Sequence, residues 1–315
     1  MNFRTDIQLK KERNQIDYNA QLLLIGSCFS ENISEKLNYF KFNTYSNPFG
    51  ILFNPAAIEL LITNAVNEKT YTENDIFQHN ERWHCFDAHS ALSNTDKKKL
   101  LHNLNAAIQK THQQLCKSTH IIITLGTAWV YRFIETDFIV GNCHKVPQKK
   151  FLKELLPSDE ILASLENMSA LIKDVNPNTN IIFTVSPVRH LKDGFVENSQ
   201  SKALLLTAIH QFIDKRKQLY YFPSYEIMLD DLRDYRFYNS DMIHPNETAI
   251  NYIWERFVNV WIHDNSIAIM KEVDSIQKGL AHKPFHPNAE QHKLFLAALH
   301  AKIKVLKKEY NISFS

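Results

Sequence analysis

The sequence predicts an α/β protein with a three-layer α/β/α arrangement of the flavodoxin type, built on about five parallel strands and followed by a C-terminal helical extension. Two observations predict this class. Short apolar runs alternate with segments of helical periodicity over residues 1–264, which is the pattern of a parallel sheet covered on both faces. Polar and nucleophilic side chains follow these runs, and in a doubly wound sheet the ligand crevice lies beyond the carboxyl ends of the strands.

Five runs have the length expected of strands. Each spans four to six residues and is bounded by polar or turn residues, as a short buried strand is. We place the strands at residues 21–25, 41–45, 120–125, 180–185 and 219–222. Five parallel strands fit a flavodoxin-like sheet.

Capping residues mark the helix starts between these strands. Asn54-Pro55 combines an N-cap residue with a proline at the first helical position. Ser158 is followed by two acidic residues, which favour the first turn of a helix. A further helix is predicted by apolar residues at helical spacing, namely Ile250, Ile253, Trp254, Phe257 and Trp261.

Two segments lie outside this repeat. Residues 129–140 alternate in polarity around a turn at residues 135–137, which predicts a β-hairpin near the crevice. Residues 265–315 contain two amphipathic stripes separated by prolines, which predicts a pair of helices. We therefore predict a main unit over residues 1–264 and a helical extension over residues 265–315 packed on it.

The composition excludes several classes of protein. The net charge is only +2 and the basic residues are dispersed, so we expect no nucleic-acid partner. The first residues contain no secretory signal pattern, and no apolar run approaches the ~18 residues needed to cross a bilayer. The sequence therefore predicts a cytoplasmic protein without a membrane span. Four cysteines without paired CxxC spacing favour reduced thiols over a disulfide framework.

A nucleophile is predicted at the end of the first strand. That apolar run ends in Gly26-Ser27-Cys28, where a strand turns into a helix. Far downstream, Asp241 and His244 stand three residues apart before an amphipathic helix. One loop can therefore supply a general base and the carboxylate that orients it. Together these residues predict nucleophilic acyl chemistry.

Each of these residues also has a purely structural interpretation, which the sequence leaves open. Cys28 has the properties of a small buried side chain that ends a strand, since unpaired cysteine is among the most buried residue types. Asp241 and His244 are also compatible with a loop that precedes the helix cap Asn246. Ser27 is the main rival of Cys28 as the nucleophile.

Four motifs resemble those of the GSCFA family. They are Gly26-Ser27-Cys28-Phe29, Thr124-Leu125-Gly126-Thr127-Ala128-Trp129, Asn142-Cys143-His144-Lys145 and the late Asp-x-x-His-Pro at residues 241–245. The family is similar in plan to the SGNH or GDSL esterases, which carry a Gly-Asp-Ser turn, a glycine after the second strand, a Gly-x-Asn after the third and a final Asp-x-x-His. The resemblance spans residues 20 to 260 and implies an SGNH-hydrolase-like fold acting on an ester or other acyl group.

This resemblance implies a role for each motif residue. Cys28 takes the place of the nucleophilic serine, Ser27 that of the aspartate, and Ala128 that of the asparagine. A thiol at the first turn of a helix lies near the positive end of the helix dipole, and a nearby imidazole lowers its pKa further, so we expect a thiolate near neutral pH. His244 would serve as base and then as acid, while Asp241 accepts its second ring N–H.

The tetrahedral intermediate also needs hydrogen-bond donors for its oxyanion. The backbone N–H groups of Cys28 and Gly50 are the expected donors. Because Ala128 stands where the esterase pattern has asparagine, one side-chain donor is missing, and Asn142, or else Asn47, is the expected substitute.

Further substrate contacts are expected from residues after the other strands. Asn142 and His144 follow the hairpin, and Gly126 follows the third strand. Arg189 and His190 follow the fourth strand, where they are expected to bind an anionic substrate group or to pair with a nearby carboxylate.

A second group of residues has the chemistry of metal ligands. His84, Cys85 and His89 are suitable ligands, with Cys143 and His144 as further donors. However, the two histidines of the first segment are not at i, i+4, and an extended chain directs them to opposite faces. We therefore predict no metal site.

The sequence thus predicts a hydrolase with a nucleophile–His–Asp triad in residues 1–264, acting on a small-molecule or carbohydrate-linked acyl substrate without a cofactor. The departures from the esterase pattern leave two alternatives open: an acyltransferase using the same site, and a binding module whose catalytic residues have decayed. A metal hydrolase is a third. The sequence predicts no oligomeric state.

Overall fold

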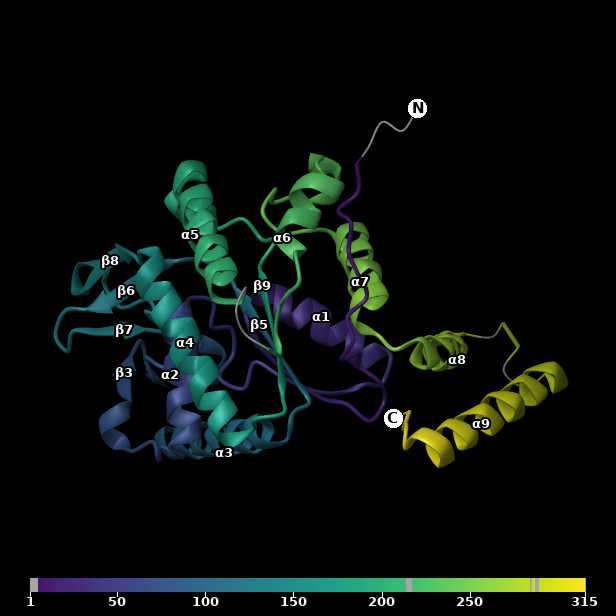
Figure 1. Cartoon of the computed structure of the whole chain (residues 1–315). Helices are drawn as coiled ribbons and strands as arrows, with labels where there is room; N and C mark the ends of the chain where they lie inside the picture. The colour runs from purple at the N-terminus through teal and green to yellow at the C-terminus, as the bar shows by residue number, and fades with distance from the viewer. Residues whose placement is uncertain (1–4, 214–216, 284, 287–288, 315) are drawn as a thin grey trace.

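A five-stranded parallel sheet forms the centre of the protein (Figure 1). The structure is a computed structural model, and it describes residues 5–213, 217–283, 285–286 and 289–314. The strands of the sheet are β1 (Gln21–Gly26), β2 (Asn43–Ser46), β5 (His120–Leu125), β9 (Asn180–Val185) and β10 (Leu219–Tyr221). Their spatial order is β10-β9-β5-β1-β2, with every neighbouring pair parallel. This is the flavodoxin order, so the predicted fold class is confirmed.

The predicted strands match the observed ones to within two residues. The largest difference is at β2, which begins at Asn43 rather than at residue 41. Lys41 has a positive φ of 63° and its N–H donates to Asn38 O at 3.0 Å, so it still belongs to the turn that ends the preceding helix. A strand cannot start in that left-handed conformation.

Helices cover both faces of the sheet, which gives three layers (Figure 1). On one face lie α2 (Pro55–Val66), α3 (Lys97–Lys117), α4 (Ser158–Val175) and α5 (Phe195–Ile213); on the other lie α1 (Cys28–Tyr39) and α7 (Glu247–Trp261). Successive strand residues point to opposite faces. In β1, Leu23 packs into the first core cluster, whereas Leu22 and Leu24 pack into the second. An uninterrupted apolar run is therefore required in the central strands.

The predicted helix starts are present. The Asn54 side chain accepts a hydrogen bond from Ala57 N at 2.8 Å, and Pro55 occupies the first helical position of α2. α4 begins at Ser158 as predicted, although Pro157 precedes it and provides no side-chain cap. Short helical turns lie at Glu73–Asp75, Ser90–Leu92, Gln148–Lys150, Leu191–Asp193, Ser224–Glu226 (α6), Ile227–Asp231 and Tyr235–Phe237.

Two small antiparallel sheets accompany the central one. The predicted hairpin is formed by β6 (Trp129–Phe133) and β7 (Phe138–Val140). A third strand, β8 (Phe151–Leu155), pairs with β6 and was not predicted, because its sequence FLKEL is too short and mixed to show strand periodicity. The hairpin of β3 (Phe77–His79) and β4 (Arg82–His84) was also missed.

The C-terminal residues form the predicted helical pair, α8 (Asp264–Ala281) and α9 (Glu290–Tyr310). The two helices pack through a small cluster of buried apolar side chains that includes Val273 and Leu299. Tyr39 attaches this pair to α1, since its hydroxyl donates to Asp274 Oδ1 at 2.9 Å. The division of the chain into separate units at residue 264 stays a prediction. In the described part of the chain, no helix has both the length and the apolar composition that a membrane crossing requires.

Candidate active site

The turn between β1 and α1 has a conformation that depends on glycine. Gly26 has φ +145°, and a Cβ built there would lie 2.2 Å from Thr124 O of the neighbouring strand. The next residue, Ser27, is buried; its N–H donates to Thr124 O at 3.1 Å and its Oγ accepts from Phe29 N at 3.3 Å. Ser27 is therefore the N-cap of α1, and its oxygen is engaged with the backbone.

Cys28 is the first residue of α1 and is partly exposed, as are Cys116 and Cys143 among the four free cysteines. Burial raises the pKa of the Cys28 thiol, and the Glu31 carboxylate one turn along the helix adds to this effect. The N–H groups of Cys28 and Phe29 and the Lys202 ammonium act in the opposite direction but do not compensate. The expectation of a thiolate near neutral pH is therefore wrong for the free protein, because burial outweighs the helix terminus.

The thiols of Cys28, Cys143 and Cys85 have raised pKa values, so we expect them to react with iodoacetamide only at raised pH and in a defined order. Only the thiolate reacts. Burial raises the pKa of Cys143 to about 11 and that of Cys85 to about 12, while the increase at Cys28 is smaller. Labelling should therefore rise first at Cys28, at a pH above the ordinary cysteine value of about 8.5, then at Cys143 and last at Cys85. Peptide mass spectrometry across pH 7 to 11 measures the order, and full Cys28 labelling at pH 7 would contradict it.

Lys202 lies beneath this turn and was not predicted. It is 1% exposed, and its Nζ donates to Gly126 O and Ser186 O at 2.7 Å each. These carbonyls belong to the residues that follow β5 and β9. Burial lowers the pKa of Lys202 to about 7, and the nearby Cys28 thiolate opposes that decrease. Lys202 thus connects α5 to the ends of β5 and β9 through the hydrogen bonds of one buried amine.

The turn after β2 is built from Asn47 and Gly50, both with positive φ. The Asn47 side chain accepts from Gly26 N at 2.9 Å and donates to Glu31 Oε1 at 3.3 Å. The Gly50 N–H donates to Asn47 O at 2.8 Å inside the turn. The expectation of a free oxyanion donor at Gly50 is therefore wrong, since that N–H closes the turn. Asn47 holds the turn between β1 and α1 in place with both ends of its side-chain amide.

Asp241 and His244 form a close pair in the loop before α7. His244 Nδ1 lies 2.7 Å from Asp241 Oδ2, and Asp241 Oδ1 accepts from the N–H groups of Ile243 and His244 at 2.8 and 3.0 Å. These three hydrogen bonds lower the pKa of Asp241 to about 2. A carboxylate only accepts, so Nδ1 carries a proton, and in the neutral ring Nε2 is then the nitrogen with the lone pair of a base.

This loop is attached to the end of β9. Arg189 N donates to Ile243 O at 3.2 Å, and its guanidinium donates to Met242 O at 3.4 Å. The Asp241 and His244 side chains are 44% and 45% exposed. Among the described residues, no hydrogen bond joins the Cys28 thiol to the His244 ring. The structure therefore brings His244 and Asp241 together, without a hydrogen bond from this pair to Cys28 in the described residues.

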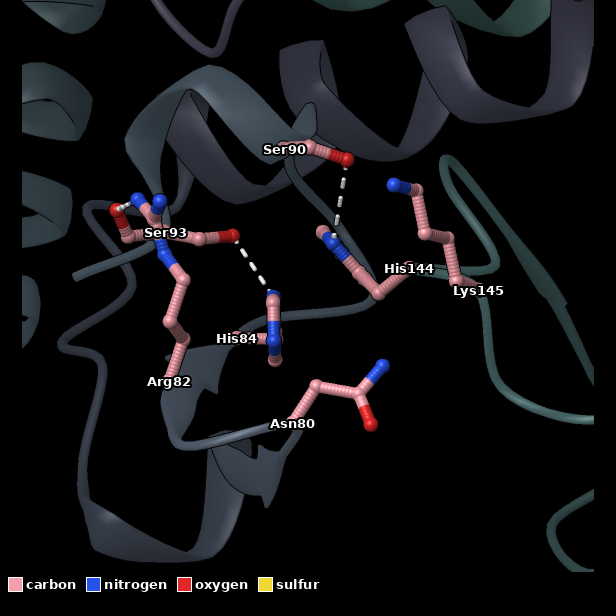
Figure 2. A pocket seen from close by; sticks show the side chains of 7 residues that line it. All are labelled: Asn80, Arg82, His84, Ser90, Ser93, His144 and Lys145. Atoms are coloured by element: carbon pink, nitrogen blue, oxygen red, sulfur yellow. Dashed lines mark hydrogen bonds between the residues drawn. The ribbon is translucent and has the colours of Figure 1, made fainter. Parts of the chain in front are cut away.

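The residues after the hairpin line two neighbouring pockets. Asn142 Oδ1 accepts from His144 N at 2.8 Å and from Ser90 Oγ at 3.2 Å. His144 is buried and its Nε2 lies 2.7 Å from Cys85 O; burial lowers its pKa to about 4. His144 and His84 line a pocket of about 200 Å³, and their ring centroids are 4.7 Å apart. Figure 2 shows the two side chains in this pocket. His144 is thus neutral and held by the protein.

The second of these pockets, of about 280 Å³, extends from His144 toward the main sheet. Its lining includes Asn142, Trp129 and Phe53. Phe53 also packs against Gly126, where an added Cβ would lie 2.8 Å from Phe53 Cβ. The Gly126 N–H donates to Phe53 O at 2.7 Å and its carbonyl accepts from Lys202, so both backbone groups are engaged.

Arg189 and His190 have different surroundings from each other. The Arg189 guanidinium stacks on Tyr238 and Tyr235, at 4.1 and 4.9 Å from the ring centroids. His190 Nδ1 lies 3.4 Å from the buried carboxylate of Asp193, which also forms an ion pair with Lys153. Of the two expected roles, His190 follows the carboxylate pairing. The binding of an anionic substrate group by Arg189 stays a prediction.

The candidate metal ligands are engaged elsewhere. His84 Nδ1 lies 2.7 Å from Ser93 Oγ, and its Nε2 lies 3.0 Å from His79 O. Within the described ranges, no group of three or more His, Cys, Asp and Glu side chains is arranged to hold a metal ion.

The sequence analysis missed two charged residues near Cys28, namely Glu31 and Lys202. A usable signal existed for Lys202. It lies three and seven residues before Leu205 and Ile209, on the buried stripe of α5, and a lysine on an apolar stripe requires an internal partner. Glu31 carried no such signal, because acidic residues are common in the first turn of a helix.

The comparison with protein families agrees with these motifs. The sequence profile of the GSCFA family matches residues 21–257, and that of the GSCFA domain protein C-terminal domain matches residues 273–315. The protein belongs to the GSCFA family. The first match includes Cys28, Asp241 and His244, and the second covers the second half of α8 and all of α9. This GSCFA protein matches none of the curated proteins.

Solved structures similar to this GSCFA protein are remote. A family 3 carbohydrate esterase of Clostridium thermocellum is 12% identical, with a TM-score of 0.34, over 80% of this chain and 97% of that one. A family 3 carbohydrate esterase from Talaromyces cellulolyticus is 9% identical, with a TM-score of 0.36, over 80% of this chain and 99% of that one. At these values the similarity carries no argument about activity.

Proposed function

We propose that this GSCFA protein is an acyl hydrolase in which Cys28 is the nucleophile, His244 the general base and Asp241 the residue that orients the base. The observation that carries the proposal is the Asp241–His244 pair, with a 2.7 Å contact between carboxylate and Nδ1. That contact leaves the Nε2 lone pair for a proton, which is the arrangement required of a catalytic base. The proposed substrate is an ester of a small molecule or of a carbohydrate.

The position of both partners on the sheet supports this assignment. Cys28 follows β1, and the His244 loop is attached to the end of β9. These strands are separated only by β5, so their carboxyl ends are about 10 Å apart. Both side chains therefore come from the same edge of the sheet. Catalytic hydrogen bonds are often long in free enzymes and shorten when substrate binds.

In the proposed reaction, His244 Nε2 takes the Cys28 proton as the thiol sulfur attacks the substrate carbonyl carbon. The tetrahedral intermediate collapses, the alcohol leaves with the proton from His244, and a thioester remains on Cys28. A water molecule, deprotonated by His244, then attacks the thioester and releases the acid and the thiol. Because the pKa of Cys28 is raised, His244 acts here as a base toward a neutral thiol.

The oxyanion donor in this proposal is the Cys28 N–H at the start of α1. The first N–H groups of a helix lack intrahelical acceptors, and the helix dipole favours negative charge there. The Asn142 amide nitrogen is the proposed second donor, since Asn142 lines the second pocket and its hydrogen bonds with His144 N and Ser90 Oγ are accepted by Oδ1.

Trapping the thioester tests the proposal. Incubation with p-nitrophenyl acetate followed by acid quench and peptide mass spectrometry should place one acetyl group on Cys28. Cys28→Ala should abolish both the adduct and the release of nitrophenol, whereas Cys116→Ala, which removes another partly exposed thiol, should keep both. Ser27→Ala should remain acetylated at Cys28 and lose about 1 kcal/mol of stability with its cap. An acetyl group on Ser27, or turnover by Cys28→Ala, would refute the assignment.

A further inference from the structure

The buried lysine beneath the nucleophile turn has no role in the triad. Lys202 is 1% exposed, yet it forms no ion pair with a carboxylate in the part of the chain that the structure describes. Its Nζ contacts two carbonyl oxygens, Gly126 O and Ser186 O, at 2.7 Å each. A buried lysine with only neutral partners is costly, because desolvation of the ammonium is uncompensated. A lysine in this setting indicates that its ammonium is compensated only when a negative charge forms nearby.

The geometry places this amine beside the turn that carries Cys28. Gly126, whose carbonyl accepts from Lys202, lies against the nucleophile turn, since a Cβ on Gly126 would be 3.4 Å from Ser27 Cβ. The preceding residue of α5, Ser201, accepts from Ala128 N at 2.7 Å and holds the same loop. α5 therefore supports the loop after β5 directly beside the turn that carries the thiol.

Few charged groups surround Cys28 and Lys202 in the part of the chain that the structure describes. Cys28 faces the Glu31 carboxylate on α1 and the Lys202 ammonium on α5. Lys202 in turn faces the thiol, the His190 ring after β9, and the Tyr225 ring, whose centroid lies 5.5 Å from Nζ. Glu31 disfavours a thiolate, and Lys202 is the cation that favours it.

We infer that Lys202 is a positioning residue whose ammonium is the counter-charge of the Cys28 thiolate. When Cys28 gives up its proton, Lys202 holds one, so the buried pair carries no net charge. The ion pair is less costly than a lone buried thiolate, because each charge compensates the desolvation of the other. Burial lowers the pKa of Lys202, whereas a negative charge on Cys28 raises it, so the thiolate helps Lys202 to keep its proton.

Three substitutions distinguish the effect of the Lys202 charge from the effect of its hydrogen bonds to the two carbonyls. Lys202→Gln keeps an N–H donor for the carbonyls and removes the charge. Lys202→Met removes both, and Lys202→Arg keeps a permanent charge. We expect Gln and Met to slow iodoacetamide labelling of Cys28 by about 10-fold at pH 6.5, where Lys202 still carries its charge, because a one-unit increase in the pKa of Cys28 reduces the thiolate fraction tenfold. Arg should label at least as fast as the wild type.

Two results would overturn the inference. If Lys202→Gln labels like the wild type, the lysine is only a tether. If Arg slows labelling as much as Met, the effect follows packing and not charge. Lys192→Gln is the matched control: Lys192 lies near Cys143 and favours its thiolate, so this variant should slow Cys143 and leave Cys28 unchanged.

The inference rests on the proposed function only in taking Cys28 as the nucleophile. Labelling uses no acyl substrate, so its outcome is independent of whether the protein hydrolyses esters. A protein that labels as expected but forms no thioester would retain the thiolate–ammonium pair and lose the proposed hydrolase activity.

Discussion

Replacing His244 with alanine is expected to lower kcat/KM for ester hydrolysis by about 100- to 10,000-fold, the range that a positioned acid–base group contributes. The physical reason is that the Cys28 thiol is mostly protonated at neutral pH, since burial raises its pKa. Without His244 Nε2 no base removes the thiol proton as the sulfur attacks. Initial rates of p-nitrophenyl acetate hydrolysis at pH 7.5 measure the loss.

The control for this prediction is His102→Ala, which removes an exposed histidine on α3 and should leave the rate unchanged. The fold of His244→Ala should be intact, because the His244 and Asp241 side chains are half exposed and such pairs contribute little to stability. Asp241→Asn should also reduce the rate, since an amide does not select the Nδ1–H tautomer. Equal rates for His244→Ala and wild type would exclude His244 as the base.

Gly26→Ala is expected to destabilise the protein by about 3 to 5 kcal/mol. Two costs add: an L-residue at φ +145° is strained, and the new Cβ would overlap backbone atoms of Thr124 in β5, with oxygen 2.2 Å and nitrogen 2.8 Å away. Backbone of a central strand does not move aside, so the end of β1 must separate from β5. The change in unfolding free energy from urea denaturation measures the effect.

Gly279→Ala provides the comparison. Gly279 lies inside α8, and its added Cβ would meet the flexible end of Leu299 at 2.8 Å. Leu299 has room to adjust its rotamer, and alanine favours the helix by about 1 kcal/mol. We expect little loss of stability. If Gly26→Ala were as mild as Gly279→Ala, the nucleophile turn would not require glycine.

Much of the fold was predictable because it depends on local patterns. The runs that became β1, β5 and β9 are apolar at their central positions, residues 22–25, 121–123 and 181–183, as strands buried on both faces must be. The caps at Asn54 and Asn246 act within three residues of themselves. The strand β8 was missed because it is stabilised by pairing with β6 rather than by its own sequence.

The candidate site divides in the same way. Cys28, Asp241 and His244 could be selected from motif and strand position, and the Asp241–His244 contact spans only three residues. The engagement of the Gly50 N–H, the buried position of His144 and the presence of Lys202 beneath Cys28 could not. Each depends on segments far apart in the chain, such as Lys202 and Gly126.

The sequence by itself determined the three-layer α/β class, the strand positions and the residues of the predicted triad, because periodicity, caps and short motifs act over a few residues. The tertiary structure alone decided the protonation of the nucleophile. Whether Cys28 is a thiol or a thiolate depends on how deeply it is buried and on the charges of Glu31 and Lys202 around it. The burial of Cys28 and the electrostatic field at its sulfur depend on residues from distant parts of the chain, so no local sequence pattern determines them.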